Sequence, residues 1–175
     1  FSFGLDDQLP ARARLVGEGL LAPTEITEEI TAGNFAVVQR LAFWTAAVRM
    51  FASNPIGGVG LGNYEARYSD FNLGRWSDSL GHAHNFYLNM AAETGIVGLV
   101  PFLAFIAVVL VLARRAADSA STLQTAAIAS LASIGAFVAH NMVDNIFVGG
   151  MGVLFGVAVG LALAANRKSE TQVSG

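Results

Sequence analysis

The pattern of polar and apolar positions divides the 175-residue chain into two parts. Nine of the 13 acidic residues precede position 79, and the remaining four are Glu93, Asp118, Asp144 and Glu170. The second half is dominated by apolar stretches, and about 20 apolar residues are enough to cross a bilayer as a helix. The pattern therefore predicts a polar region over residues 1–85 and a membrane region over residues 86–166.

The membrane region is expected to contain three transmembrane helices. They are predicted at about 86–113, 122–146 and 147–166. A kink is expected near Pro101, because a proline inside a helix lacks the N–H donor and crowds the preceding turn. The second and third spans would form a helical hairpin around "HNMVDN", residues 140–145.

Basic residues predict the orientation of these spans. Arg114 and Arg115 follow the first span, and Arg167 and Lys168 follow the third. Positive charge near a span end is retained on the cytoplasmic side. We therefore expect a multi-pass protein of the cytoplasmic (inner) membrane, with residues 167–175 as a cytoplasmic tail and residues 1–85 as a loop on the periplasmic or extracellular side.

Within the polar region, residues 35–55 have a helical pattern. Asn34 is a plausible N-cap and Pro55 a plausible stop. The stretch is apolar around most of its circumference, as expected of a helix that lies in the membrane interface. Arg40 and Trp44 are four positions apart, so they share a face of this helix.

Composition supports a membrane protein and argues against nucleic acid as a partner. Hydrophobic residues make up 54% of the chain and charged residues 13%, whereas ordinary soluble domains have about 25% charged residues. The formal net charge of -3 gives no electrostatic reason to bind nucleic acid. Cysteine is absent, which excludes disulfides and cysteine nucleophiles. The chain begins at Phe1, and we interpret it as the C-terminal part of a longer protein.

The glycine-rich run "GGVGLG", residues 57–62, resembles a phosphate-binding loop in composition but not in motif. It lacks the Lys-Ser/Thr pair of a P-loop, and no strand is evident before it. We expect these glycines to allow a sharp turn and a close approach to other backbone. The run leads into a short predicted helix on which Tyr64 and Tyr68 are four positions apart.

Two of the three histidines, His82 and His84, precede the first predicted span. They could form part of a metal site with His140 or Asp144, but the chain lacks an H-E-x-x-H signature, and we predict no metal. A histidine has an ordinary pKa of about 6.5, so this side chain can also act as a general acid or base near neutrality. At the mouth of a membrane domain, that role fits a reaction between a lipid-borne donor and a soluble acceptor.

Other polar groups have both a structural and a functional interpretation. Glu93 is an ionisable residue inside a predicted span, where it is either the partner of an arginine in a helix absent from this sequence or part of a solute pathway. His140 and Asp144, four apart at the 140–145 turn, either satisfy that turn by hydrogen bonding or take part in function. Arg40, Arg67 and Arg75 are expected on the outer side.

Two sequence blocks carry a resemblance to a known family. "HNFYLNMAAETGIVG", residues 84–98, fits the pattern His-Asn, nine residues, Gly, two residues, Gly. "RLAFWTAAVRMFASNPIGGVGLGNY", residues 40–64, contains Arg-x3-Trp followed by Pro-x-x-Gly-x-Gly-x-Gly and an aromatic. In this order and spacing, over about residues 36–165, the chain resembles the O-antigen ligases and O-antigen polymerases.

The resemblance implies a fold and an activity. The expected fold class is an all-α integral membrane protein, a polytopic helical bundle of the GT-C-like kind, represented here by part of the large periplasmic loop and the last three transmembrane helices. The implied activity is a metal-independent, inverting transfer of a glycan from an undecaprenyl-diphosphate carrier. The implied acceptor is lipid A core, a growing polysaccharide or a protein, and no cofactor is expected. The alternative is a small-solute, bicarbonate-like transporter of the same superfamily.

The resemblance also implies site residues. Arg40 would hold the leaving diphosphate, and His84 would orient or deprotonate the acceptor hydroxyl. The additional candidates for substrate binding are Asn85, Arg67, Arg75, His82 and Trp44. Since a diphosphate needs fixed donors, arginine is the expected residue type, although surface solvation also explains Arg67 and Arg75. Trp44 and Tyr64 are expected to pack or to stack on a sugar.

Overall fold

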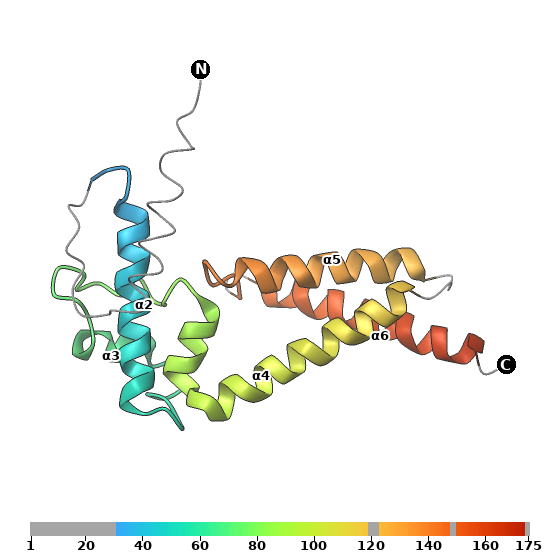
Figure 1. Cartoon of the computed structure of the whole chain (residues 1–175), viewed down its shortest axis with the longest axis horizontal. Coiled ribbons are helices and arrows are strands. Elements are labelled where there is room, and N and C mark those ends of the chain that lie inside the picture. The colour runs from blue at the N-terminus through green and yellow to red at the C-terminus, as the bar shows by residue number, and fades with distance from the viewer. Residues whose placement is uncertain (1–30, 119–122, 148–149, 174–175) are drawn as a thin grey trace, which may run out of the picture. The chain divides into compact units, whose positions relative to one another are not determined.

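A computed structural model describes residues 31–118, 123–147 and 150–173 of the chain (Figure 1). These residues form helices and turns without a strand, as the all-α prediction requires. The elements are α2 (Phe35–Ser53), α3 (Tyr64–Arg67), the 3-10 helix η1 (Tyr68–Asp70), α4 (Phe86–Asp118), α5 (Gln124–His140) and α6 (Met151–Val173). The chain forms two compact units, residues 1–96 and 97–175, and each is described by itself. Residues 1–30 of the predicted loop, residue 122 of the second predicted span and residues 148–149 of the third lie outside the described residues.

Helix α2 forms the centre of the first unit. It follows Asn34 and ends at Ser53, close to the predicted limits. The Asn34 side chain accepts a hydrogen bond from the Thr31 N–H (2.8 Å) and does not cap an amide of α2. Most of the helix from Val38 to Met50 is buried inside the unit, which accounts for its apolar circumference. A position in the membrane interface stays a prediction.

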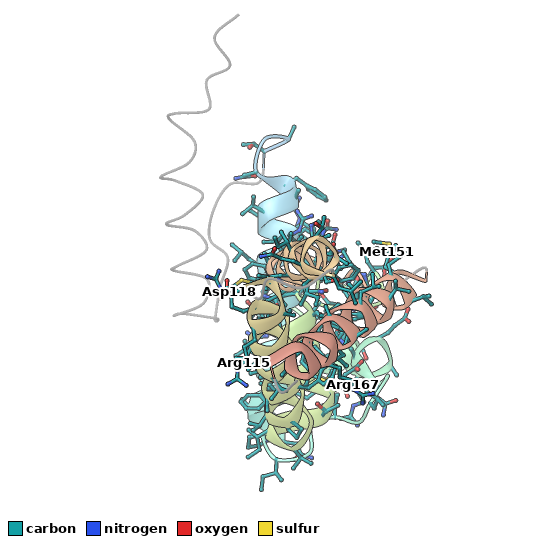
Figure 2. The ribbon with its side chains drawn as sticks, turned by 90° about the vertical axis from the view of Figure 1, so that its right-hand side faces the viewer. Arg115, Asp118, Met151 and Arg167 are labelled. Carbon is teal, nitrogen blue, oxygen red and sulfur yellow. The ribbon has the colours of Figure 1, made fainter. Side chains whose placement is uncertain are left out.

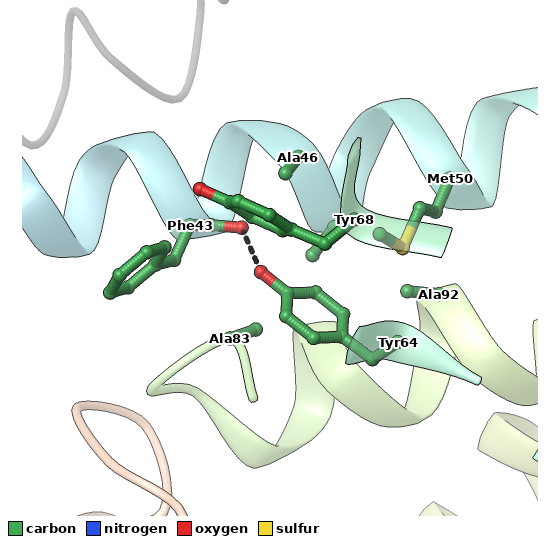
Figure 3. Packing of buried hydrophobic residues seen from close by; sticks show 8 residues of the cluster. Phe43, Ala46, Met50, Tyr64, Tyr68, Ala83 and Ala92 are labelled. Atoms are coloured by element: carbon green, nitrogen blue, oxygen red, sulfur yellow. Dashed lines mark hydrogen bonds between the residues drawn. The ribbon is translucent and has the colours of Figure 1, made fainter. Parts of the chain in front are cut away.

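The core of the first unit joins α2 to the two tyrosines of the following short helices. It consists of Phe43, Ala46, Ala47, Met50, Tyr64, Tyr68, Ala83 and Ala92 (Figure 3). The Tyr64 hydroxyl donates a hydrogen bond to the Phe43 carbonyl (3.0 Å), and the Tyr68 ring meets Phe43 edge-on at 5.8 Å between centroids. Burial raises the pKa of Tyr64 above its usual range, and burial together with the Asp78 charge raises the pKa of Tyr68 to about 12. Both are therefore neutral packing groups, so the packing role expected for Tyr64 is confirmed.

The glycine-rich turn closes the end of the first helical part of α4. The Val59 N–H donates to the Ala92 carbonyl and the Gly60 N–H to the Glu93 carbonyl, both at 2.9 Å. These bonds satisfy carbonyls that a helix end leaves without partners. Gly58 has a φ of 66°, and a Cβ there would overlap the backbone of Glu93. The predicted sharp turn with a close backbone approach is confirmed.

Helix α4 is interrupted at Gly95. The sequence analysis had instead predicted a kink near Pro101. Gly95 has φ 59° and ψ -159°, a conformation that is essentially restricted to glycine. A Cβ at this position would overlap the Ile56 carbonyl, and the next amide, Ile96 N–H, donates to the Pro55 carbonyl (2.9 Å). The break therefore results from docking of the glycine-rich turn, a long-range contact, and not from the local effect of proline.

Glu93 is buried in the first unit, with 9% of its surface exposed. Its Oε1 accepts a hydrogen bond from the Tyr64 N–H (3.0 Å), one of the amides at the start of α3. A carboxylate at a helix N-terminus is stabilised by the amides there and by the helix dipole. This hydrogen bond gives Glu93 a structural role in joining α4 to α3. An arginine partner in a helix outside this sequence stays a prediction.

Replacing Glu93 should separate the hydrogen-bond role from the charge. Glu93→Gln keeps an acceptor oxygen, so we expect a small loss of thermal stability. Glu93→Ala leaves the buried Tyr64 N–H without its acceptor and should cost about 1–3 kcal/mol. Thermal unfolding of the detergent-purified variants measures both effects, and equal losses in the two variants would contradict this role.

The second unit consists of α4 from Val97 onward together with α5 and α6. By length and composition α4 can cross a membrane, and α5 and α6 are shorter apolar helices. One buried cluster, Ala116, Ala117, Ala127 and Ala165, brings the last turns of α4 and α6 to the first turns of α5. Arg115 and Arg167 therefore lie at the same end of this unit, and Met151, at the start of α6, lies toward the other end. Figure 2 labels these three residues. Helices α4, α5 and α6 thus alternate in direction. Their identity as three consecutive membrane spans stays a prediction.

The turn between α5 and α6 is closed by its own asparagines. Asn141 is 2% exposed; its Nδ2 donates to the Phe137 carbonyl (2.9 Å), and its Oδ1 accepts from the Ile146 N–H (3.1 Å). Helix α5 ends at His140, so Asp144 lies in the turn that follows it. Asp144 accepts a hydrogen bond from the Asn145 N–H (2.8 Å). The hydrogen-bonding interpretation of this turn is confirmed.

Candidate functional site

The loop that carries His84 precedes α4 and packs against the middle of α2. The imidazole of His84 is stacked on the Phe43 ring, with centroids 5.4 Å apart and planes at 22°. The indole N–H of the next residue, Trp44, donates to the His84 carbonyl (3.2 Å). Two consecutive residues of α2 thus hold the ring and the backbone of His84.

His84 has a left-handed backbone, with φ 50°. This conformation is uncommon outside glycine, although histidine is among the residues that adopt it more often. Its cost, of order 1–2 kcal/mol, must be offset by the surrounding contacts. Such outliers cluster at active sites, where structure holds a side chain in a defined position. The backbone of His84 is therefore an independent reason to treat it as a functional residue.

His82 supports this arrangement from within the loop. Its Nδ1 accepts a hydrogen bond from the His84 N–H (3.1 Å), and the two rings lie 4.3 Å apart. A nitrogen that accepts a hydrogen bond carries no proton, so the neutral His82 ring carries its proton on Nε2. The geometry supports a structural role for His82 and leaves His84 as the candidate for proton transfer.

Two asparagines fix the loop to the start of α4. The Asn85 side chain accepts from the Leu88 N–H (3.0 Å) and so acts as the N-cap of α4. The buried Asn89 side chain accepts from the Ala83 N–H (3.0 Å). Asn89 was missed by the sequence analysis, although a polar residue one turn after Asn85 in an apolar stretch was a usable signal.

Arg40 lies one helical turn before Trp44, on the same face of α2. Its Nε is buried and has no hydrogen-bond acceptor among the described residues. A buried donor without a partner is unfavourable by about 1–3 kcal/mol, and more when the group is charged. An anion bound to the guanidinium would remove this cost.

The two other arginines of the predicted site are not joined to the His84 loop by any hydrogen bond or ion pair within residues 31–118. Arg67 forms an ion pair with Asp70 (Nε to Oδ2, 3.0 Å), and both side chains are about half exposed. Arg75 is exposed. An exposed pair of this kind contributes little to stability, so the geometry favours surface solvation for both residues.

The first unit contains the elements of an acid–base and anion-binding site. His84 offers an imidazole in a fixed loop, and Arg40 offers a permanent positive charge from the helix that holds this loop. Sequence reasoning missed Phe43, whose contact with His84 joins residues far apart in the chain.

Comparison with known proteins identifies the family. A family model described as O-antigen ligase matches residues 6–103, which is more than half of the chain. No curated protein and no solved structure matches the chain. The matched stretch includes α2, the glycine-rich turn, the His84 loop and the first part of α4. The chain therefore belongs to the O-antigen ligase family.

Proposed function

We propose that the chain transfers a glycan from an undecaprenyl-diphosphate carrier to a lipid A core, a growing polysaccharide or a protein. Family membership supports a glycosyltransferase of the ligase or polymerase type, and the apolar helices support a membrane location. The observation that carries the finer proposal is the buried Nε of Arg40, which has no acceptor among the described residues and lies one turn from the tryptophan that holds His84. The site would lie on the periplasmic or extracellular side of the cytoplasmic membrane.

On the donor side, Arg40 binds the diphosphate that leaves. A guanidinium keeps its charge at all physiological pH values and presents planar donors that match phosphate oxygens. Negative charge builds up on the leaving diphosphate as the glycosidic bond breaks, so this contact strengthens in the transition state. The reaction then needs no metal to neutralise the leaving group.

On the acceptor side, His84 acts as the general base. The acceptor hydroxyl oxygen attacks the anomeric carbon on the face opposite the diphosphate, which inverts the configuration. The hydroxyl proton passes to the His84 imidazole, and the electron pair of the broken carbon–oxygen bond stays with the undecaprenyl diphosphate. A positioned base of this kind contributes about 10²–10⁴-fold to the rate.

The remaining candidates support these two groups. Trp44, His82 and Asn85 hold the loop through the hydrogen bonds described above. Trp44 is only 9% exposed, so packing is its main role and little of its ring is left for a sugar. Arg67 and Arg75, which are exposed, would contribute long-range attraction of the anionic donor.

The transporter alternative has lost its main support. It relied on Glu93 as a polar group inside a membrane span, and the Glu93 carboxylate accepts a hydrogen bond from the Tyr64 N–H in the first unit. The family match also points to glycan transfer.

A transfer assay tests the proposal. Purified protein in vesicles is given a labelled undecaprenyl-diphosphate glycan, with lipid A core and free glycan offered as separate acceptors, in the presence and absence of EDTA. We expect label on at least one acceptor, with the anomeric configuration inverted and with no effect of EDTA. Absence of transfer to every acceptor, or retention of configuration, would overturn the proposed reaction.

A further inference from the structure

The glycine-rich turn presents two large apolar side chains outward. Ile56 is 65% exposed and Leu61 is 78% exposed. No charged residue occurs between Arg49 and Glu65. Single exposed apolar residues are common on proteins, but two on one uncharged turn form a local surface that requires an explanation.

The backbone of the turn makes the exposure of Leu61 a built-in feature. Gly60 and Gly62 flank it with φ values of 104° and 76°. The neighbouring Val59 packs against the core, and the Asn63 side chain donates to the Val59 carbonyl (3.2 Å). The turn thus places Val59 inward and Leu61 outward while hydrogen bonds hold its shape.

The turn lies where the long apolar part of α4 begins. The Ile96 N–H donates to the Pro55 carbonyl (2.9 Å), so the turn adjoins the first residue after the break at Gly95. Residues 96–113 contain no charged side chain. At about 1.5 Å per residue they extend about 27 Å, close to the roughly 30 Å of a bilayer's hydrocarbon core. For a membrane-spanning α4, Ile96 would mark one edge of that core.

We infer that the turn of residues 55–62 inserts Ile56 and Leu61 into the membrane–water interface on the outer side of the cytoplasmic membrane. The partner is the lipid bilayer, because the turn continues the apolar surface that starts at Ile96, itself 47% exposed. This inference rests on the membrane position of α4 and not on the proposed reaction.

Such an insertion would set the height of the site above the lipid. The turn caps one end of the helical part formed by residues 86–94, and His84 precedes the other end. These nine residues extend about 13 Å. His84 would then lie within about 15 Å of the hydrocarbon edge, in or just beyond the headgroup layer, where the diphosphate of a lipid-linked donor emerges.

Depth measurement by spin labelling tests this inference. The chain has no cysteine, so Leu61→Cys and Ile56→Cys each give one nitroxide site in otherwise unchanged protein. Ser69→Cys, at an exposed position of η1, is the matched control. The protein is placed in vesicles of phosphatidylethanolamine and phosphatidylglycerol, and power saturation is measured with oxygen and with a water-soluble nickel chelate.

We expect the labels at positions 56 and 61 to be relaxed by oxygen and shielded from nickel, and the label at 69 to show the opposite. Because two positions are labelled separately, the test remains valid if one of the two variants does not fold. Nickel access at both positions equal to that at 69 would show that the turn faces water. Shielding from both reagents would show that protein covers it. Either result would overturn the inference, and neither bears on whether the protein transfers glycan.

Discussion

Replacing His84 with alanine should abolish glycan transfer while the protein remains inserted in the membrane. The proposed base would be lost, and loss of a positioned base lowers the rate by about 10²–10⁴-fold. Alanine also tolerates the left-handed backbone of position 84 poorly. His84→Asn is therefore the sharper variant, because asparagine adopts this conformation more readily but has no imidazole.

The control for His84 is His140→Ala. His140 is exposed at the end of α5 in the second unit, and the proposed mechanism gives it no part. We expect its variant to transfer glycan at the wild-type rate, measured with the labelled donor in vesicles. Wild-type transfer by His84→Asn would remove His84 from the chemistry.

Gly95→Ala should have the largest effect on stability. Alanine at this position would combine a backbone conformation restricted to glycine with overlap of its Cβ and the Ile56 carbonyl. We expect a loss of at least about 3 kcal/mol, enough to prevent accumulation of folded protein. Yield of monodisperse protein on size exclusion and thermal unfolding in detergent measure this loss.

Two other glycines separate the causes of that loss. Gly62 has a φ of 76° but open space where a Cβ would lie, so Gly62→Ala should cost only the backbone strain of about 1–2 kcal/mol. Gly156 lies within α6, also with open space, and Gly156→Ala should be neutral or stabilising by up to about 1 kcal/mol. If Gly95→Ala were as stable as Gly62→Ala, the close docking of the turn on α4 would be wrong.

The sequence predicted the apolar helices because their signal is local. Long uncharged stretches and the positions of Asn34 and Pro55 were enough to place α2 and the start of α4. The break in α4 was predicted at the wrong residue, because proline is known to kink its own helix and Pro101 lies within α4. The helix is instead interrupted at Gly95 by a turn that lies about 40 positions earlier in the chain. Contacts of this kind depend on tertiary packing and leave no periodic pattern.

The same limit applies to the site. His84 and Arg40 were found through motifs whose spacing resembles a family, and the Trp44 position came with them. The stacking of His84 on Phe43 and the hydrogen bond from Trp44 join residues about 40 positions apart, so sequence spacing could not reveal them. For Glu93 the residue type suggested a membrane function, and only the structure revealed its hydrogen bond to the Tyr64 N–H.

The central claim is a division of labour, in which Arg40 binds the donor diphosphate and His84 serves the acceptor. Binding of an undecaprenyl-diphosphate glycan to purified protein in nanodiscs, measured for Arg40→Ala, His84→Asn and the exposed control Arg67→Ala, tests it most directly. We predict that Arg40→Ala weakens binding about tenfold or more, as loss of a charge-assisted contact implies, and that the other two variants bind like the wild type. Wild-type binding by Arg40→Ala, or loss of binding in His84→Asn, would contradict the account.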